Sequence, residues 1–358
     1  YKISKDHGSN MWEWDEEPAK SDPDLESSEE IIRFFSKVDM FYEGIELPEA
    51  LHIGGAWKGD LISRRKHQMN IYHSKDIKAV SNLHENMFYN ELVAGMWLYH
   101  YYDGTMPLSA KMNFAGDFVD YISTYPNDPY LKSKIPIKSW GLRNRSQPEL
   151  GILKMPDFCH AMECNLVLES LKLSSKDSIN VLEIGSGFGG LAERLFSSEK
   201  IKSLYLTDLP LNLVTAFYYL RRCFPKNEVI LISSLDELLQ LNSGSSTLPD
   251  KRIVLAPTCF FEGFANSNEL DLMCNFGSFS EMDYQTINFY MSHLPESLKI
   301  ICLSNSNRPV YASNHTEVCS DNFPYPSNFK QVFSSIAMPI RGQSGRVKSS
   351  VHINSTLI

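Results

Sequence analysis

Short apolar runs alternate with amphipathic segments over the C-terminal half of the chain. The runs predicted as buried strands are Asn180–Ile184, Ser203–Thr207, Val229–Ser233, Ile253–Ala256, Leu270–Asn275 and Lys299–Leu303. Helical periodicity separates them, over Leu191–Ser197, Leu211–Cys223, Leu235–Leu241 and Tyr284–His293. Strands that alternate with helices predict a parallel sheet covered on both faces. We therefore expect an α/β, doubly wound, Rossmann-like sheet. Either Val229–Ser233 or Ile253–Ala256 is its third strand, and the pattern does not decide which.

The N-terminal part of the chain has a different pattern. Residues 1–28 are polar and acidic, so we expect them to form a surface arm. Residues 29–150 are expected to form a helical cap or substrate domain, and residues 151–358 the sheet domain. Further helices are predicted over Glu29–Tyr42, over 60–102 and over Met155–Leu171.

The most informative stretch is 179–190, which reads Ile-Asn-Val-Leu-Glu-Ile-Gly-Ser-Gly-Phe-Gly-Gly. A buried strand is followed by glycines at alternate positions, and Gly190 opens a helix. Glycine is needed where a backbone turns at positive φ or lies against a ligand. The helix that follows directs its N-terminal amides towards the loop. This pattern predicts a ligand site at the carboxyl end of the strand.

Two cofactors use such a loop, and a turn without a ligand is the plain alternative. A dinucleotide requires G-x-G-x-x-G because its pyrophosphate lies at the helix start, and Gly185, Gly187 and Gly190 have that spacing. S-adenosylmethionine (SAM) carries an ammonium and a sulfonium, so it favours an acid at the strand end, where Glu183 lies. A carboxylate beside a pyrophosphate would repel it, which favours SAM. Asp208, at the end of the next strand, could bind ribose hydroxyls of either cofactor.

The segment Glu-Ile-Gly-Ser-Gly-Phe-Gly-Gly-Leu-Ala at 183–192 resembles the first motif of class I SAM-dependent methyltransferases. Residues 140–310 resemble the bacterial sugar O-methyltransferase family, through Asp208-Leu209-Pro210, Ala216–Leu220, Phe224-Pro225 and Asn275–Met282. The chain departs from the family pattern at Ser280, where the family has Gln. The resemblance implies SAM-dependent transfer of a methyl group to a hydroxyl of a sugar or a glycosylated small molecule. It also implies a final antiparallel pair in the sheet, here Phe329–Met338 and Arg346–Thr356.

Candidate site residues are those that follow strands, because ligands of doubly wound sheets bind at the carboxyl ends of the strands. The expected SAM contacts are Glu183, Gly185, Ser186, Gly187, Gly189, Asp208, Leu209, Asn275 and Phe276. The candidates for accepting the hydroxyl proton are Glu281, His315 and Asp117, and the candidate acceptor contacts are Ser278, Arg308 and Tyr311. Plainer roles are open for four of them: Asn275 as a turn former, Glu281 as a helix-start acid, His315 as a surface histidine and Asp117 as a structural residue. No H-E-x-x-H or closely spaced acidic set is present, so no metal ligands are assigned, and the sequence leaves open whether a divalent metal is needed.

Composition narrows the class of partner. The formal net charge is −9, which argues against non-specific nucleic-acid binding. No run approaches 18 apolar residues, so no membrane span is expected. The seven cysteines are scattered without a C-x-x-C, which indicates buried free thiols and a cytoplasmic location. The chain begins at Tyr1 rather than Met, which leaves open whether residues precede it.

Three functions are therefore compared. The leading one is a SAM-dependent O-methyltransferase for a small, sugar-type acceptor. The second is a methyltransferase for a secondary metabolite or lipid, because an aromatic cap also suits an apolar acceptor. The third is a methyltransferase-like binding module without activity. The sequence leaves open the acceptor, the methylated position and whether the chain forms a homo-oligomer.

Overall fold

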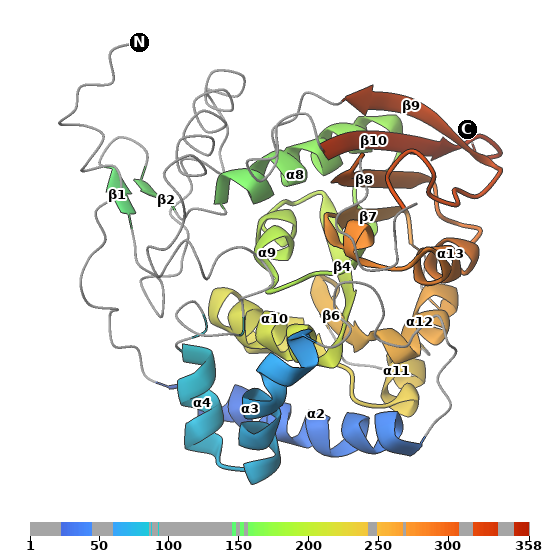
Figure 1. Ribbon diagram of the computed structural model, residues 1–358. Helices are drawn as coiled ribbons and strands as arrows, with labels where there is room; N and C mark the ends of the chain where they lie inside the picture. The colour runs from blue at the N-terminus through green and yellow to red at the C-terminus, as the bar shows by residue number, and fades with distance from the viewer. Residues whose placement is uncertain are drawn as a thin grey trace, which may run out of the picture.

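A mixed, eight-stranded sheet forms the centre of the molecule (Figure 1). The computed structural model describes residues 23–44, 60–85, 87, 92, 145–147, 151–153, 157–242, 249–267, 270–307, 318–335 and 347–357. The strands of the sheet are β3 (Ile179–Ile184), β4 (Ile201–Asp208), β5 (Val229–Leu231), β6 (Arg252–Pro257), β7 (Leu272–Phe276), β8 (Ile300–Ser306), β9 (Phe329–Ser335) and β10 (Val347–Asn354). A separate two-stranded hairpin pairs β1 (Arg145–Gln147) with β2 (Gly151–Leu153).

The strand order is β5-β6-β4-β3-β7-β8-β10-β9. Strands β3 to β8 are parallel, and β10 is antiparallel to both of its neighbours. The expected α/β, doubly wound fold is thus confirmed, and so is the expected final antiparallel pair. Both strands between which the sequence could not choose belong to the sheet: β6 pairs with β4, and β5 extends the edge beyond it. The strands that follow β3 are added first on one side of it, as β4 and β6, and then on the other side, as β7 and β8. The carboxyl ends of β3 and β7 therefore flank the switch point at which such sheets bind ligands.

Helices cover both faces of the sheet. They are α2 (Leu25–Gly44), α3 (Asp60–Ser74), α4 (Ile77–Glu85), α8 (Asp157–Ser170), α9 (Gly190–Phe196), α10 (Pro210–Cys223), α11 (Leu235–Asn242), α12 (Phe261–Ser267) and α13 (Tyr284–Ser292). One core packs α8, α9, α10 and the N-terminal helices on residues such as Val181 and Leu204. The other packs α11, α12 and α13 on Leu182 and Tyr205. Adjacent residues of each strand therefore serve opposite cores, as the two-residue period of a strand requires.

The N-terminal helices share the core of the sheet domain. Ile31, Phe34 and Val38 of α2 belong to the same buried cluster as Val181 and the apolar residues of α10. The helix begins at Leu25, four residues before the predicted start, and the buried side chain of Asp24 bonds Lys226. The last residues of the expected arm are thus part of the packed structure. No helix in the described ranges is both long and apolar enough to cross a bilayer.

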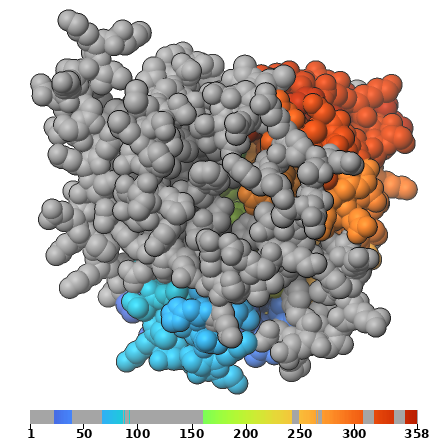
Figure 2. All heavy atoms as spheres, in the orientation of Figure 1, coloured from blue at the N-terminus to red at the C-terminus, as the bar shows by residue number. Residues whose placement is uncertain are grey.

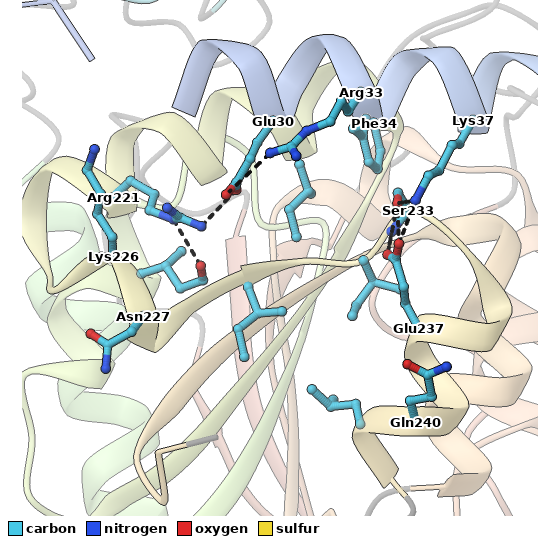
Figure 3. Close-up of a pocket in the computed structure, with 15 residues that line it drawn as sticks. Glu30, Arg33, Phe34, Lys37, Arg221, Lys226, Asn227, Ser233, Glu237 and Gln240 are labelled. Atoms are coloured by element: carbon cyan, nitrogen blue, oxygen red, sulfur yellow. Dashed lines mark hydrogen bonds and ion pairs between the residues drawn. The ribbon is translucent and has the colours of Figure 1, made fainter. Parts of the chain in front are cut away.

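Helix α2 and the edge strand β5 line the same groove, and the helix lies at the end of the molecule opposite β9 (Figure 1). Ion pairs hold the helix in this position: Arg221 Nη2 lies 2.7 Å from Glu30 Oε2, and Lys37 Nζ lies 2.6 Å from Glu237 Oε1 (Figure 3). A groove of about 790 Å³ separates the helix from the strand. In the space-filling view the N-terminal helices α3 and α4 lie opposite the C-terminal strands (Figure 2). Helix α2 and strand β9 thus lie at opposite edges of the sheet.

A buried histidine is expected to make the protein sensitive to acid. His84 is fully buried, stacks on Tyr218 at 4.9 Å and hydrogen-bonds Tyr72. Burial lowers the pKa of its imidazole from 6.5 to about 3. The unfolded chain therefore binds a proton below pH 6.5 that the folded protein does not, so stability falls as the pH falls from 6.5 towards 3. At pH 4.5 we expect a loss of about 3 kcal/mol relative to pH 7.

Urea denaturation of the protein and of His84→Gln at both pH values measures this loss. The variant should show a smaller difference between pH 7 and pH 4.5. The matched control is His73→Gln, an exposed position on α3, which should leave the difference unchanged. An equal pH dependence in the protein and in His84→Gln would contradict the prediction.

Candidate functional site

The glycine loop after β3 has the backbone that its sequence predicts. Gly185, Gly187 and Gly189 have φ angles of 77°, 57° and 88°, a region that side chains disfavour. At Gly185 a side chain is also excluded by space, because a Cβ there would lie 2.0 Å from Ser278 Oγ. The loop is thus pressed between β3 and the turn that follows β7.

Gly190 is a glycine for a different reason. A Cβ at this position would lie 2.6 Å from the His160 ring and 2.6 Å from Phe188 Cζ. Close packing of α8 on the start of α9 therefore requires this glycine. Gly190 is the third glycine of the dinucleotide spacing, and the contact between α8 and α9 explains it without the need for a bound phosphate.

Each of the three loop glycines donates its amide hydrogen to the protein itself. Gly185 N donates to Thr207 O at 2.8 Å, and Gly189 N donates to Ser186 O at 2.9 Å. Gly187 N donates to Asp208 Oδ2 at 2.8 Å. A loop that binds pyrophosphate offers these amides to the ligand. In this loop they are already bonded, and one of them faces a carboxylate.

Asp208 connects the loop to the end of β4 and the start of α10. Besides Gly187, its carboxylate accepts hydrogen bonds from Leu209 N at 2.6 Å and Asn212 Nδ2 at 2.9 Å. The side chain is 8% exposed. A fixed carboxylate beside the loop is suited to accept hydrogen bonds from a diol. Asn212, four residues after the acid in the first turn of α10, was not predicted as a site residue; the i, i+4 spacing is the signal that could have found it.

Glu183, the acid that precedes the loop, is almost completely buried. It lies in register with Cys274 of β7. Burial raises the pKa of the Cys274 thiol well above its ordinary value, and the charge of Glu183 raises it further. The carboxyl group of Glu183 therefore lies on β3 just before the loop, and that of Asp208 lies beside the loop.

Asn275 ends β7 within a closed set of hydrogen bonds. Its Nδ2 donates to Ile184 O at 2.7 Å and to Ser278 Oγ, and its Oδ1 accepts from Phe279 N and Asn305 Nδ2. All four hydrogen-bonding positions of the amide are therefore used within the protein. The side chain, expected at the cofactor, joins β3, β7 and β8 and holds the turn Ser278–Glu281 against the loop.

Ser280 and Asn305 complete the attachment of this turn. Ser280 Oγ donates to Asn305 Oδ1 at 3.3 Å and accepts from Ser306 N at 2.8 Å. Ser280 thus ties the turn to β8. Asn305 was not predicted, because its role depends on the pairing of β7 with β8.

The structure places the other predicted residues as follows. Ser186 and Phe276 are buried, and Leu209, Ser278 and Glu281 are partly exposed near the carboxyl edge of the sheet. Asp117, Arg308, Tyr311 and His315 lie outside the described residues. Within the described ranges, no three or more His, Cys, Asp or Glu side chains are arranged to hold a metal ion. Cys164, Cys274 and Cys302 are buried free thiols, as expected, whereas the free thiols of Cys223, Cys259 and Cys319 are only partly buried.

Comparisons with known proteins give a likeness to methyltransferases. No family model matches the chain, and no curated protein does. Among solved structures, the methyltransferase domain of bacterial CtHen1 is 14% identical, with a TM-score of 0.35; the match covers 55% of this chain and 99% of that one. The N-methyltransferase NodS from Bradyrhizobium japonicum, in complex with S-adenosylhomocysteine, is 17% identical, with a TM-score of 0.34 and coverage of 55% and 87%.

A third similar structure is phosphoethanolamine N-methyltransferase 1 from Haemonchus contortus, in complex with phosphoethanolamine and S-adenosylhomocysteine. It is 12% identical, with a TM-score of 0.34, and the match covers 70% of this chain and 50% of that one. The strand order itself establishes the fold.

Proposed function

We propose that this chain is a SAM-dependent O-methyltransferase that binds SAM at the glycine loop. The observation that carries the proposal is the contact between Gly187 N and the Asp208 carboxylate. A pyrophosphate would have to displace this carboxylate and would meet its negative charge. SAM brings an ammonium and a sulfonium instead, so the charges of Asp208 and Glu183 favour it. A nicotinamide dinucleotide is correspondingly disfavoured.

The protein contacts assigned to SAM follow the loop. The backbone at Gly185, Ser186, Gly187 and Gly189 would lie against the methionine part, and Asp208 and Leu209 would hold the ribose. SAM supplies an electrophilic methyl carbon. Transfer of that carbon to an acceptor hydroxyl would break its bond to sulfur, and a base of this chain would take the hydroxyl proton. Glu281, on the turn held by Asn275, is the candidate base among the described residues. His315 and Asp117 are the two other candidates, and both lie outside the described residues.

The acceptor is proposed to be a hydroxyl of a sugar or a glycosylated small molecule, on the basis of the sequence resemblance. Ser278, Arg308 and Tyr311 are assigned to the acceptor, and the free thiols support a cytoplasmic location. Incubation with methyl-labelled SAM and a panel of sugar, lipid and aromatic hydroxyl compounds tests the class. Label in the sugar compounds supports the assignment, and label in the other classes alone would overturn it.

Replacement of Asp208 tests the binding site itself. Asp208→Asn removes the charge and places an amide against Gly187 N–H, so we expect the affinity for S-adenosylhomocysteine to fall about 100-fold. Isothermal titration calorimetry measures the affinity for S-adenosylhomocysteine and for NAD. Asp236→Asn, an exposed position on α11, is the matched control and should bind as the unaltered protein does. Tight binding of NAD, or unchanged binding by Asp208→Asn, would contradict the proposal.

A further inference from the structure

The side chain of Phe188 anchors the glycine loop from below. Phe188 lies between Gly187 and Gly189 in the sequence and is 5% exposed. Its ring meets the rings of two different helices edge to face: His160 of α8 at 5.6 Å and Tyr219 of α10 at 5.1 Å. The loop is therefore tied to both helices by its single aromatic residue.

A buried carboxylate fixes each of the two rings that hold Phe188. His160 Nδ1 lies 3.0 Å from Glu163 Oε2, and the Tyr219 hydroxyl donates to Glu193 Oε2. The Glu163 side chain is 1% exposed and that of Glu193 is 6% exposed. Burial of carboxylates is unfavourable unless they are well bonded, so apolar packing alone would not require this arrangement. The hydrogen bonds fix the orientation of the two rings.

We propose that His160 and Tyr219 are positioning residues that hold Phe188, and through it the glycine loop, in the shape that binds the ligand. The inference rests on the proposed function, because it assigns a ligand to the loop. Three glycines at positive φ make the loop backbone easy to deform when it is not supported. A deformable loop must be ordered on binding, which weakens affinity, whereas a loop held in advance avoids that loss. The three rings provide this support from beneath the loop.

A comparison of two buried phenylalanines tests the inference. Phe188→Leu removes the ring held by His160 and Tyr219. Phe196→Leu removes an equally buried ring at the far end of α9, which packs on Phe224. Both variants lose similar apolar packing, so we expect similar decreases in melting temperature. Only Phe188→Leu should weaken the binding of S-adenosylhomocysteine, by about tenfold, and equal affinities in the two variants would overturn the inference.

The contact at Gly190 gives a second test. Gly190→Ala introduces a methyl group that collides with His160, and it should shift the loop and weaken binding by tenfold or more. His160→Ala removes the ring in this contact, which is also one of the two rings that hold Phe188. His160→Ala alone should therefore weaken binding, as Phe188→Leu does. Unchanged binding by His160→Ala would overturn the inference.

Amide hydrogen exchange separates this inference from the proposed function. In the absence of any ligand, Phe188→Leu should speed the exchange of the amides of 185–190, whereas Phe196→Leu should leave them unchanged. If the unaltered protein binds no S-adenosylhomocysteine, the proposed function fails. Faster exchange in Phe188→Leu would still show that these rings hold the loop in place. Unchanged exchange in Phe188→Leu would overturn the inference whatever the ligand is.

Discussion

Gly185→Ala is expected to abolish binding at the glycine loop and to destabilise the whole protein. The residue has a φ of 77°, and a Cβ would lie 2.0 Å from Ser278 Oγ and 2.6 Å from Ser278 Cβ. The backbone strain and the collision with the turn Ser278–Glu281 together should lower the free energy of unfolding by about 3–5 kcal/mol. The turn cannot retreat easily, because Asn275 and Asn305 fix it to the neighbouring strands.

Urea denaturation and calorimetric titration with S-adenosylhomocysteine measure the two effects. Gly263→Ala, in α12, is the control: a Cβ there meets the flexible end of Leu235 at 3.0 Å, so the loss should be small. Gly185→Ala combined with Ser278→Gly relieves the collision and keeps the strain, so it should recover part of the stability. Binding by Gly185→Ala at the affinity of the unaltered protein would show that the loop geometry does not matter.

Asn275→Asp is expected to cost about 3–5 kcal/mol of unfolding free energy, although the two side chains have the same size. The substitution replaces an Nδ2 donor, which bonds Ile184 O at 2.7 Å, by an oxygen that faces the same carbonyl. The site is completely buried, so a charge there would not be solvated by water. The new carboxyl group would stay protonated to a higher pH than usual, and the loss should therefore grow as the pH rises.

Denaturation at pH 5 and pH 8 tests both the size and the sign of this loss. Asn227→Asp, at an exposed position, makes the same chemical change and should alter stability by less than about 0.5 kcal/mol at either pH. A loss in Asn275→Asp no larger than that of the control would refute the amide network as a source of stability.

Local patterns predicted the parts of the fold that depend on local chemistry. The strands of the sheet were found because apolar runs of strand length alternate with helical periodicity, and the glycine loop because positive φ selects glycine. Helix α12 was missed, because its seven residues are too few to show a period. The position of β5 at the edge could not be predicted either, since it depends on pairing with β6 and not on the sequence of β5 itself.

The candidate site was predicted to a similar extent. Asp208 lies beside the loop as expected, because an acid at the end of the strand next to β3 must lie near the loop. The use of Asn275 within the protein was not predictable, since its partners Ile184 and Asn305 lie 91 and 30 residues away. His160 was missed for the same reason: only the packing of α8 on α9 brings it to the loop.

The position of α2 along β5 has a consequence for the synthesis of the chain. Phe34 of α2 faces the groove beside β5, and the ion pair of Lys37 with Glu237 joins residues 200 positions apart. At about 5–20 residues per second, the ribosome needs roughly 10–40 s to make the chain between them. For that time this side of the helix lacks the neighbours that cover it in the folded protein.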